Sequence, residues 1–141
     1  MKFWDSSALV PLLVNEPATP KLATIYKEDA AIIAWWGTSV ECASALARRN
    51  RENKSDAPAL AEGFARLNQI RRDWQEIQPL ESLRELAVRL TRVHNVRAAD
   101  ALQLAAAIFA SENVPGILDF VCLDARLSLS AEREGFNIVS P

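Results

Sequence analysis

Four acidic residues are the strongest candidates for chemistry in this chain: Asp5, Glu41, Asp100 and Asp124. The first and last each close a short apolar run, whereas Glu41 and Asp100 lie in the first turns of predicted helices. In an open parallel sheet, functional groups gather at the carboxyl ends of the strands and the adjoining helix starts. Four carboxylates converging there would repel one another unless a divalent cation neutralised them. The pattern therefore favours a magnesium or manganese site suited to phosphodiester chemistry.

Three of these residues also have a purely structural interpretation. Asp5 could cap a helix over residues 7–14, although Ser6 and Ser7 could cap it equally well. Glu41 fits the capping box Thr38-Ser39-Val40-Glu41, in which the glutamate reaches back to the amide of the capping residue. Asp124 could cap the helix that follows it. Asp100 is harder to explain structurally, because its helix is apolar on nearly every side and a lone carboxylate there needs a cation or a donor.

Other reactive groups are sparse. His94 is the only histidine and is interpreted as a cap at a helix end, so histidine pairs and zinc clusters are not expected. Ser6 and Ser7 lack a partner base, and no phosphate-binding glycine loop is present. Asp119 precedes a predicted strand, which would put it at the opposite edge of the sheet from Asp5, as a solvated loop residue. The four tryptophans are interpreted as packing residues.

The composition is that of one ordinary globular domain over residues 1–141. A charged residue follows the first methionine at once and no apolar run is long enough to span a bilayer, so we expect a cytoplasmic protein without a membrane segment. Cys42 and Cys122 lack metal-binding spacing and are interpreted as buried thiols.

Charge is distributed unevenly along the chain. The net charge is −2, but residues 48–97 contain 11 basic and 7 acidic side chains, which leaves the remainder with 5 basic and 11 acidic ones. The arginine-rich middle could hold a phosphate backbone while the acidic remainder holds a metal. Exposed helix faces with ion pairs between successive turns are the alternative explanation.

Hydrophobic periodicity alternates between the two element types. Strands are predicted at 2–5, 31–35, 120–124 and 136–139, and helices at 7–14, 19–29, 38–53, 56–73, 82–94, 97–112 and 126–134. Residues 74–80 are predicted to be a connector. This order predicts an α/β fold, a three-layer α/β/α sandwich with a mostly parallel central sheet of about four to five strands. The helical pair within 57–94 is predicted to be an inserted clip over the site.

Four motifs, in order and suitably separated, resemble those of the PIN domain, and within it the VapC-type toxin ribonucleases of bacterial toxin–antitoxin pairs. They are Phe3-Trp4-Asp5-Ser6-Ser7-Ala8-Leu9, Thr38-Ser39-Val40-Glu41, Ala99-Asp100-Ala101-Leu102-Gln103-Leu104-Ala105, and Phe120-Val121-Cys122-Leu123-Asp124-Ala125-Arg126-Leu127. The resemblance spans essentially the whole chain. It departs from the family at Cys122, where threonine or serine is usual, and Trp35-Trp36 is bulkier than expected.

The resemblance implies a metal-dependent endoribonuclease that leaves a 5′-phosphate and a 3′-hydroxyl. The family's acidic quartet corresponds to Asp5, Glu41, Asp100 and Asp124, which would hold Mg²⁺ or Mn²⁺. Ser6 and Ser39 are expected to support these carboxylates, and RNA is expected to contact Arg48, Arg49 and Arg97. The resemblance also implies a homodimer and a VapB-like antitoxin whose helix docks in an apolar groove and inserts a basic residue among the carboxylates.

Alternatives from other classes fit less well. A haloacid-dehalogenase-type phosphotransferase needs a second aspartate where Ser7 stands, and a receiver domain needs a late lysine, whereas none follows Lys54. A PIN module that has lost catalysis and acts by binding protein or RNA remains the non-enzymatic alternative.

Overall fold

The computed structural model describes all residues from Met1 to Pro141. Its centre is a five-stranded parallel sheet in the order β3-β2-β1-β4-β5. The strands are β1 (Lys2–Trp4), β2 (Ile32–Trp35), β3 (Gln75–Ile77), β4 (Asp119–Val121) and β5 (Asn137–Val139). All-parallel pairing requires a crossover between successive strands, and helices supply each crossover here. The α/β class and the mostly parallel sheet predicted from the sequence are confirmed.

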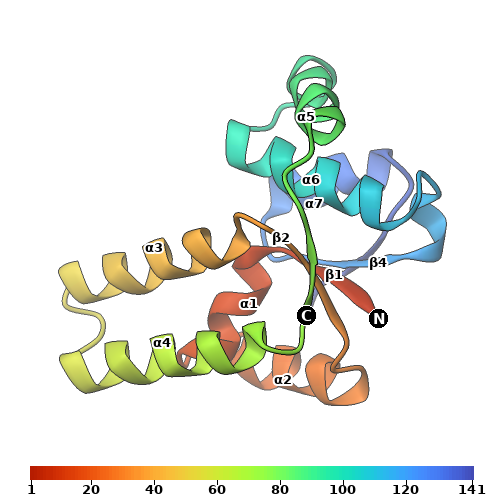
Figure 1. Ribbon diagram of the computed structural model, residues 1–141. Helices are drawn as coiled ribbons and strands as arrows, with labels where there is room; N and C mark the ends of the chain where they lie inside the picture. Colours follow the sequence, from red (N-terminus) through yellow and green to blue (C-terminus); the bar gives the residue numbers. More distant parts are fainter.

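Helices cover both faces of the sheet, which gives the three expected layers (Figure 1). They are α1 (Ser6–Leu13), α2 (Thr19–Glu28), α3 (Thr38–Arg51), α4 (Ala57–Arg71), α5 (Glu81–Val93), α6 (Ala98–Ala110) and α7 (Ala125–Arg133), with a short 3₁₀ turn, η1 (Pro115–Ile117). Each boundary lies within two residues of the sequence prediction except those around β4. That strand begins and ends earlier than predicted, so Asp124 stands in the loop before α7.

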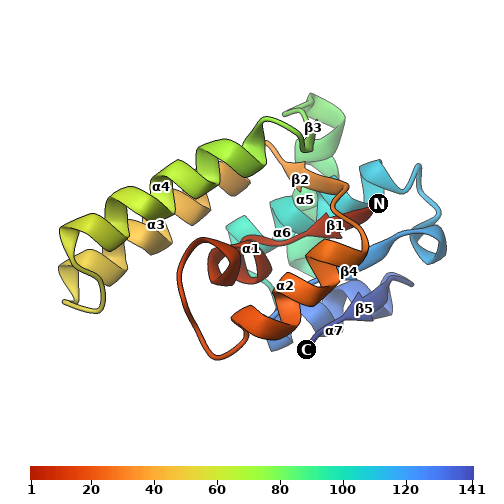
Figure 2. The ribbon, with the colours of Figure 1, turned by 90° about the horizontal axis from the view of Figure 1, so that it is seen from below.

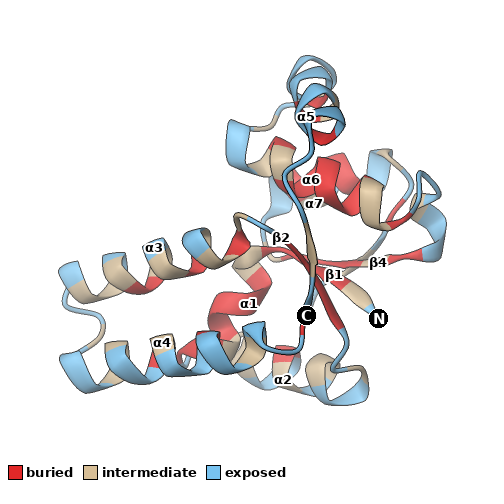
Figure 3. Ribbon diagram, viewed as in Figure 1, coloured by how far each residue is buried: buried red, intermediate tan, exposed pale blue.

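The hydrophobic core has two parts, because side chains along each strand point alternately to the two faces of the sheet. Phe3 and Phe120 face α5, α6 and α7, and their rings stack with centroids 5.2 Å apart. Trp4 and Val121, one residue further along, face the helices α1 to α4. Successive side chains of a strand point to opposite faces, so a run buried on both faces must be apolar throughout. Figure 3 shows the resulting buried strands and the buried central helix α6.

The region predicted as a connector, residues 74–80, contains β3. This strand reads Gln-Glu-Ile and lies at the edge of the sheet, where only one neighbour, β2, pairs with it. Edge strands commonly carry charged and polar side chains, which discourage pairing with other chains. The apolar signal that identified the inner strands was therefore absent from β3.

The predicted helical clip is wrong. α4 lies beside α3, on the face that carries α1 and α2, whereas α5 packs against α6 on the other face (Figures 1 and 2). β3 separates α4 from α5 in the chain, so the two helices cannot form one inserted unit. The projecting element is the α3–α4 hairpin, whose close packing is possible because Gly63 leaves space for Leu46.

None of the helices combines the length and the apolar character that crossing a membrane requires.

Candidate active site

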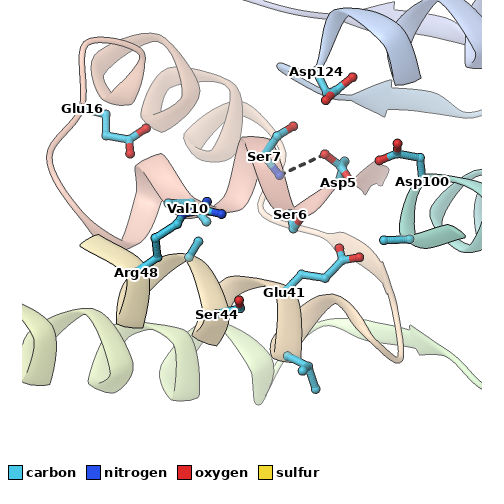
Figure 4. A pocket seen from close by; sticks show the side chains of 13 residues that line it. Asp5, Ser6, Ser7, Val10, Glu16, Glu41, Ser44, Arg48, Asp100 and Asp124 are labelled. Carbon is cyan, nitrogen blue, oxygen red and sulfur yellow. Dashed lines mark hydrogen bonds between the residues drawn. The ribbon is translucent and has the colours of Figure 1, made fainter. Parts of the chain in front are cut away.

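A cleft of about 620 Å³ opens at the carboxyl ends of β1 and β4, where α1, α3, α6 and α7 begin. Its lining includes five acidic side chains and one basic one, from Asp5, Glu16, Glu41, Asp100, Asp124 and Arg48. Figure 4 shows Asp5 between the pair Asp100 and Asp124 on one side and Glu41 on the other, with Arg48 and Glu16 further along the cleft. The fold thus brings together all four acidic residues singled out in the sequence.

Asp5 is the most buried of them, with 4% of its surface exposed. It follows β1 directly and caps α1, because its Oδ2 accepts a hydrogen bond of 2.9 Å from the backbone N–H of Ser7. Burial raises the pKa of Asp5, and the nearby Asp100 raises it further, whereas hydrogen bonds from Ser7 oppose the shift. The capping role and a chemical role are therefore compatible in one carboxylate.

Glu41 does not form the capping box that its sequence allows. Gly37 precedes the first turn of α3 without any side-chain cap, and Thr38 is buried inside that turn. Instead, Glu41 Oε2 accepts a hydrogen bond of 2.6 Å from Gln103 Nε2, which also donates to Thr38 Oγ1 at 3.0 Å. Burial raises the pKa of Glu41, as do Asp5 and Asp100, while hydrogen bonds from Gln103 and Ser6 lower it.

Asp100 and Asp124 each bind the backbone at a helix start. Asp100 Oδ2 accepts from the N–H of Arg97 at 3.3 Å, and Asp124 Oδ1 accepts from the N–H of Leu127 at 2.8 Å. Both residues line the cleft at the N-terminal ends of α6 and α7, where the helix dipole favours negative charge. Asp124 is the exposed member of the four.

Ser7 and Cys122, behind the carboxylates, connect the first turn of α1 to the loop after β4. Ser7 Oγ accepts from the N–H of Leu123 at 3.0 Å and lies 3.7 Å from Cys122 Sγ. The buried Cys122 thiol also lies 3.7 Å from Asp5 Oδ2, and burial raises its pKa to about 12, so it stays protonated and acts as the donor to this carboxylate. A thiol is a weak donor, which leaves Asp5 less well supported than a hydroxyl would.

The supporting residues differ from those suggested by the motifs. Ser6 lines the cleft, as does Ser44, whereas Ser39 is absent from the lining and forms no side-chain hydrogen bond. Gln103 was visible in the sequence only as a polar interruption of an apolar helix. Its 1% exposure was the missing information, because a buried amide needs partners: Nε2 finds them in Glu41 and Thr38, whereas Oε1 has none.

The arginines expected to contact RNA occupy different positions. Arg48 is exposed and lines the cleft. Arg49 does not line the cleft itself, but it forms a 2.9 Å ion pair with Glu16, which does. Arg97 lies with Arg126 in a second cleft, which shares Asp100 and Asp124 with the first. Arg126 had been noted only as part of the fourth motif.

His94 ends α5 as expected, but its side chain serves another purpose. Its Nε2 lies 2.6 Å from Glu134 Oε1 at the end of α7, on the side of the sheet away from α3. Asp119 is also structural, although as the first residue of β4 rather than of a loop: it pairs with Lys2 and accepts from Asn137 at the opposite edge of the sheet from Asp5.

The cleft presents carboxylate oxygens, which are the type of ligand that a hard divalent cation prefers. No three acidic, histidine or cysteine side chains stand close enough together to enclose an ion directly. Mg²⁺ usually keeps several waters and binds proteins through one or two carboxylates, so a more open arrangement still fits it. The carboxylates of the cleft thus fit a Mg²⁺ ion that keeps some of its water ligands.

No protein-family model matches the chain, and no curated protein matches it in sequence. Solved structures match its fold over nearly the whole length. VapC20 of Mycobacterium tuberculosis, a sarcin–ricin loop cleaving toxin, superposes with a TM-score of 0.72 at 15% identity and covers 100% of both chains.

Two further structures give the same result. FitAcB of Neisseria gonorrhoeae has a TM-score of 0.69 at 14% identity, covering 99% of this chain and 97% of its own. PAE2754 of Pyrobaculum aerophilum has a TM-score of 0.64 at 19% identity, covering 98% and 88%. The PIN-like fold inferred from the four sequence motifs is thereby confirmed.

Proposed function

We propose that this chain is a metal-dependent endoribonuclease, the toxin of a VapBC-type toxin–antitoxin pair. The observation that carries the proposal is the meeting of four carboxylates, from four separate segments, in one open cleft. They bring far more negative charge into the cleft than Arg48, its only basic lining residue, can offset. The likeness to VapC20, a toxin that cleaves the sarcin–ricin loop, supports RNA as the substrate class.

In this proposal Asp5, Glu41 and Asp100 hold Mg²⁺ or Mn²⁺, partly through water, and Asp124 completes the set or recruits a second ion. When bound, the ion supplies stabilisation of a phosphate oxygen and a water of lowered pKa for in-line attack. Asp5 is oriented by the N–H of Ser7 and Glu41 by Gln103, so both carboxylates are fixed before any ligand arrives. Arg48 positions the RNA backbone without reading its sequence.

The proposed partners follow from the same charge distribution. Carboxylates that repel one another attract an arginine or lysine as well as a metal. An antitoxin helix could therefore inhibit the enzyme by lying in an apolar groove and inserting one basic side chain. The helix that carries Asp100, α6, also contributes Leu102 to such a groove, of about 230 Å³, with Leu80 and Leu83. A homodimer is proposed on the family resemblance.

Two observations favour a second candidate function, a module that binds RNA or protein without cutting it. No three of the carboxylates stand close enough together to enclose an ion, and the thiol of Cys122 is only a weak hydrogen-bond donor to Asp5. Such a module would need neither a metal nor an ionised Asp5.

The test is cleavage of a structured RNA pool with added Mn²⁺ or Mg²⁺, comparing wild type with Asp5→Asn and Asp100→Asn. Asp119→Asn is the matched control, because Asp119 lies at the opposite edge of the sheet. We expect metal-dependent cutting by wild type and the control, and its loss in both active-site variants. Folded wild type that cuts nothing would favour the binding module, and cutting that survives both substitutions would locate the site elsewhere.

A further inference from the structure

A second cleft, of about 540 Å³, adjoins the acidic one and contains basic side chains that the proposed chemistry does not use. Arg97 and Arg126 line it together with Asp100 and Asp124, two acidic residues that, with Ala99, belong to both clefts. The two clefts are therefore parts of one continuous surface. Arg97 is expected from the sequence to contact RNA, whereas the sequence assigns no role to Arg126.

Arg97 and Arg126 are free to bind a ligand. Both are exposed, and neither side chain forms an ion pair within the protein, whereas Arg49, Arg66 and Arg84 all do. The neighbouring carboxylates of Asp100 and Asp124 form no ion pair with them, and their printed hydrogen bonds come from the backbone N–H groups of Arg97 and Leu127. Two unpaired guanidinium groups in one cleft form a natural receptor for a phosphate, which they can bind with paired hydrogen bonds.

The charge of each cleft indicates where an anion can rest. The lining of the first contains five acidic side chains and one arginine, so its formal charge is −4. The lining of the second contains two of each sign, so its formal charge is zero. A phosphate in the first cleft requires a cation, whereas a phosphate in the second meets two arginines directly.

The two basic sites lie on either side of the acidic residues. Arg48 stands at the end of the first cleft away from Asp100 and Asp124 (Figure 4). Arg97 and Arg126 line the second cleft, which meets the first at those two aspartates. A strand that contacts all three arginines must therefore cross the carboxylates between its contacts. We propose that the cleft of Arg97 and Arg126 binds a phosphate of single-stranded RNA next to the one that is cut. The inference rests on the proposed function, and it adds the path of the strand and a role for Arg126.

Binding of short, labelled single-stranded RNA without divalent metal tests this site separately from catalysis. We expect the double variant Arg97→Ala/Arg126→Ala to bind about tenfold more weakly than wild type. The slope of log affinity against log salt should fall by about 0.7, the value for one lost phosphate contact to a single strand. Arg126→Lys should keep the slope, because the charge remains, while losing part of the affinity.

The matched control is Arg92→Ala/Arg133→Ala, which removes two exposed arginines from the last turns of α5 and α7, outside both clefts. Equal affinities and slopes for the two double variants would overturn the proposal. The proposed nuclease activity can be rejected separately from this site. RNA binding that depends on Arg97 and Arg126, without cleavage in the presence of any metal, would support the phosphate site and reject the nuclease. Cleavage that requires Asp5 while the arginines contribute nothing would do the reverse.

Discussion

Gln103 Nε2 lies 2.6 Å from Glu41 Oε2 and joins two helices across 62 residues of sequence. The amide is buried and also donates to Thr38, so its rotamer is fixed by two acceptors on α3. It stabilises the ionised form of a carboxylate whose pKa burial would otherwise raise further. In this account Gln103 positions Glu41 for a cation without itself touching the ligand.

Replacing Gln103 by leucine should weaken Mn²⁺ binding by roughly tenfold to a hundredfold, the range usual for residues that orient metal ligands. The loss should be greatest at low pH, because Glu41 without its donor holds a proton to higher pH. Calorimetric titration of Mn²⁺ across a pH series measures both effects. Gln69→Leu, an exposed glutamine of α4, is the control. Equal Mn²⁺ affinity in Gln103→Leu and wild type would contradict the assigned role.

Asp5→Asn should make the metal-free protein more stable at pH 7, with a higher Tm than wild type. The pKa of Asp5 is raised in the folded state, so the folded protein retains a proton that the unfolded chain has lost. Stability therefore falls as pH rises from the ordinary value of 3.8 through the raised pKa, and the cost persists above it. Asparagine removes that cost and remains a good helix cap.

The corresponding measurement is thermal unfolding of both proteins between pH 3 and pH 8, a range chosen to span the titration of carboxylates. The stability difference should shrink toward the acid end, where both states are protonated. Added Mn²⁺ should raise the Tm of wild type and leave that of Asp5→Asn nearly unchanged. A variant less stable than wild type at pH 7 would mean that the cap, not the buried charge, dominates at Asp5.

Cys122→Ser should strengthen the support of Asp5. A hydroxyl at this position is a better donor than the thiol that lies 3.7 Å from both Asp5 Oδ2 and Ser7 Oγ. We expect the acid limb of the pH–rate profile to shift to lower pH, with tighter Mn²⁺ binding. Cys42→Ser is the matched control, because Cys42 is equally buried within the other core cluster and has no hydrogen-bond partner. That control should lose about 1–3 kcal/mol of stability without any shift of the profile.

Gly37→Ala should destabilise the protein by about 1–3 kcal/mol, the usual cost of forcing atoms into a packed site. A Cβ at Gly37 would stand 2.5 Å from Nε1 of the buried Trp35 ring, which must then move. Gly116→Ala is the control, since its nearest neighbour would be a backbone oxygen 4.0 Å away. Urea unfolding of the two variants measures the difference. Equal losses of stability would contradict the packing explanation.

The close contact between Gly37 and the Trp35 ring accounts for one member of the Trp35-Trp36 pair, for which the sequence indicates no role. Trp35 is buried in the core between β2 and the helices α5 and α6, and Trp36 contacts it edge-to-face at 6.3 Å with half of its own surface exposed. Burial of an aromatic residue is predictable from an apolar run. The exposure of Trp36 is not, because it depends on where the chain turns from β2 into α3.

The inner strands and long helices were predictable because a buried face imposes a regular apolar period on the sequence. β3 was not, because an edge strand needs no such period. The proximity of the four carboxylates was predictable, because the carboxyl ends of parallel strands meet at one edge of the sheet. The roles of Gln103 and Arg126 were not predictable. A contact across 62 residues and an arginine without an ion-pair partner leave no local pattern in the sequence.

The central claim is that the four carboxylates act as one divalent-cation site. Its most direct test is Mn²⁺ binding to the metal-free protein at pH 7, measured by calorimetry for wild type, Asp5→Asn and Asp119→Asn. We expect saturable Mn²⁺ binding to wild type and to Asp119→Asn, and its loss in Asp5→Asn. Wild type that binds no Mn²⁺, or Asp5→Asn that binds it as tightly as wild type, would contradict this claim.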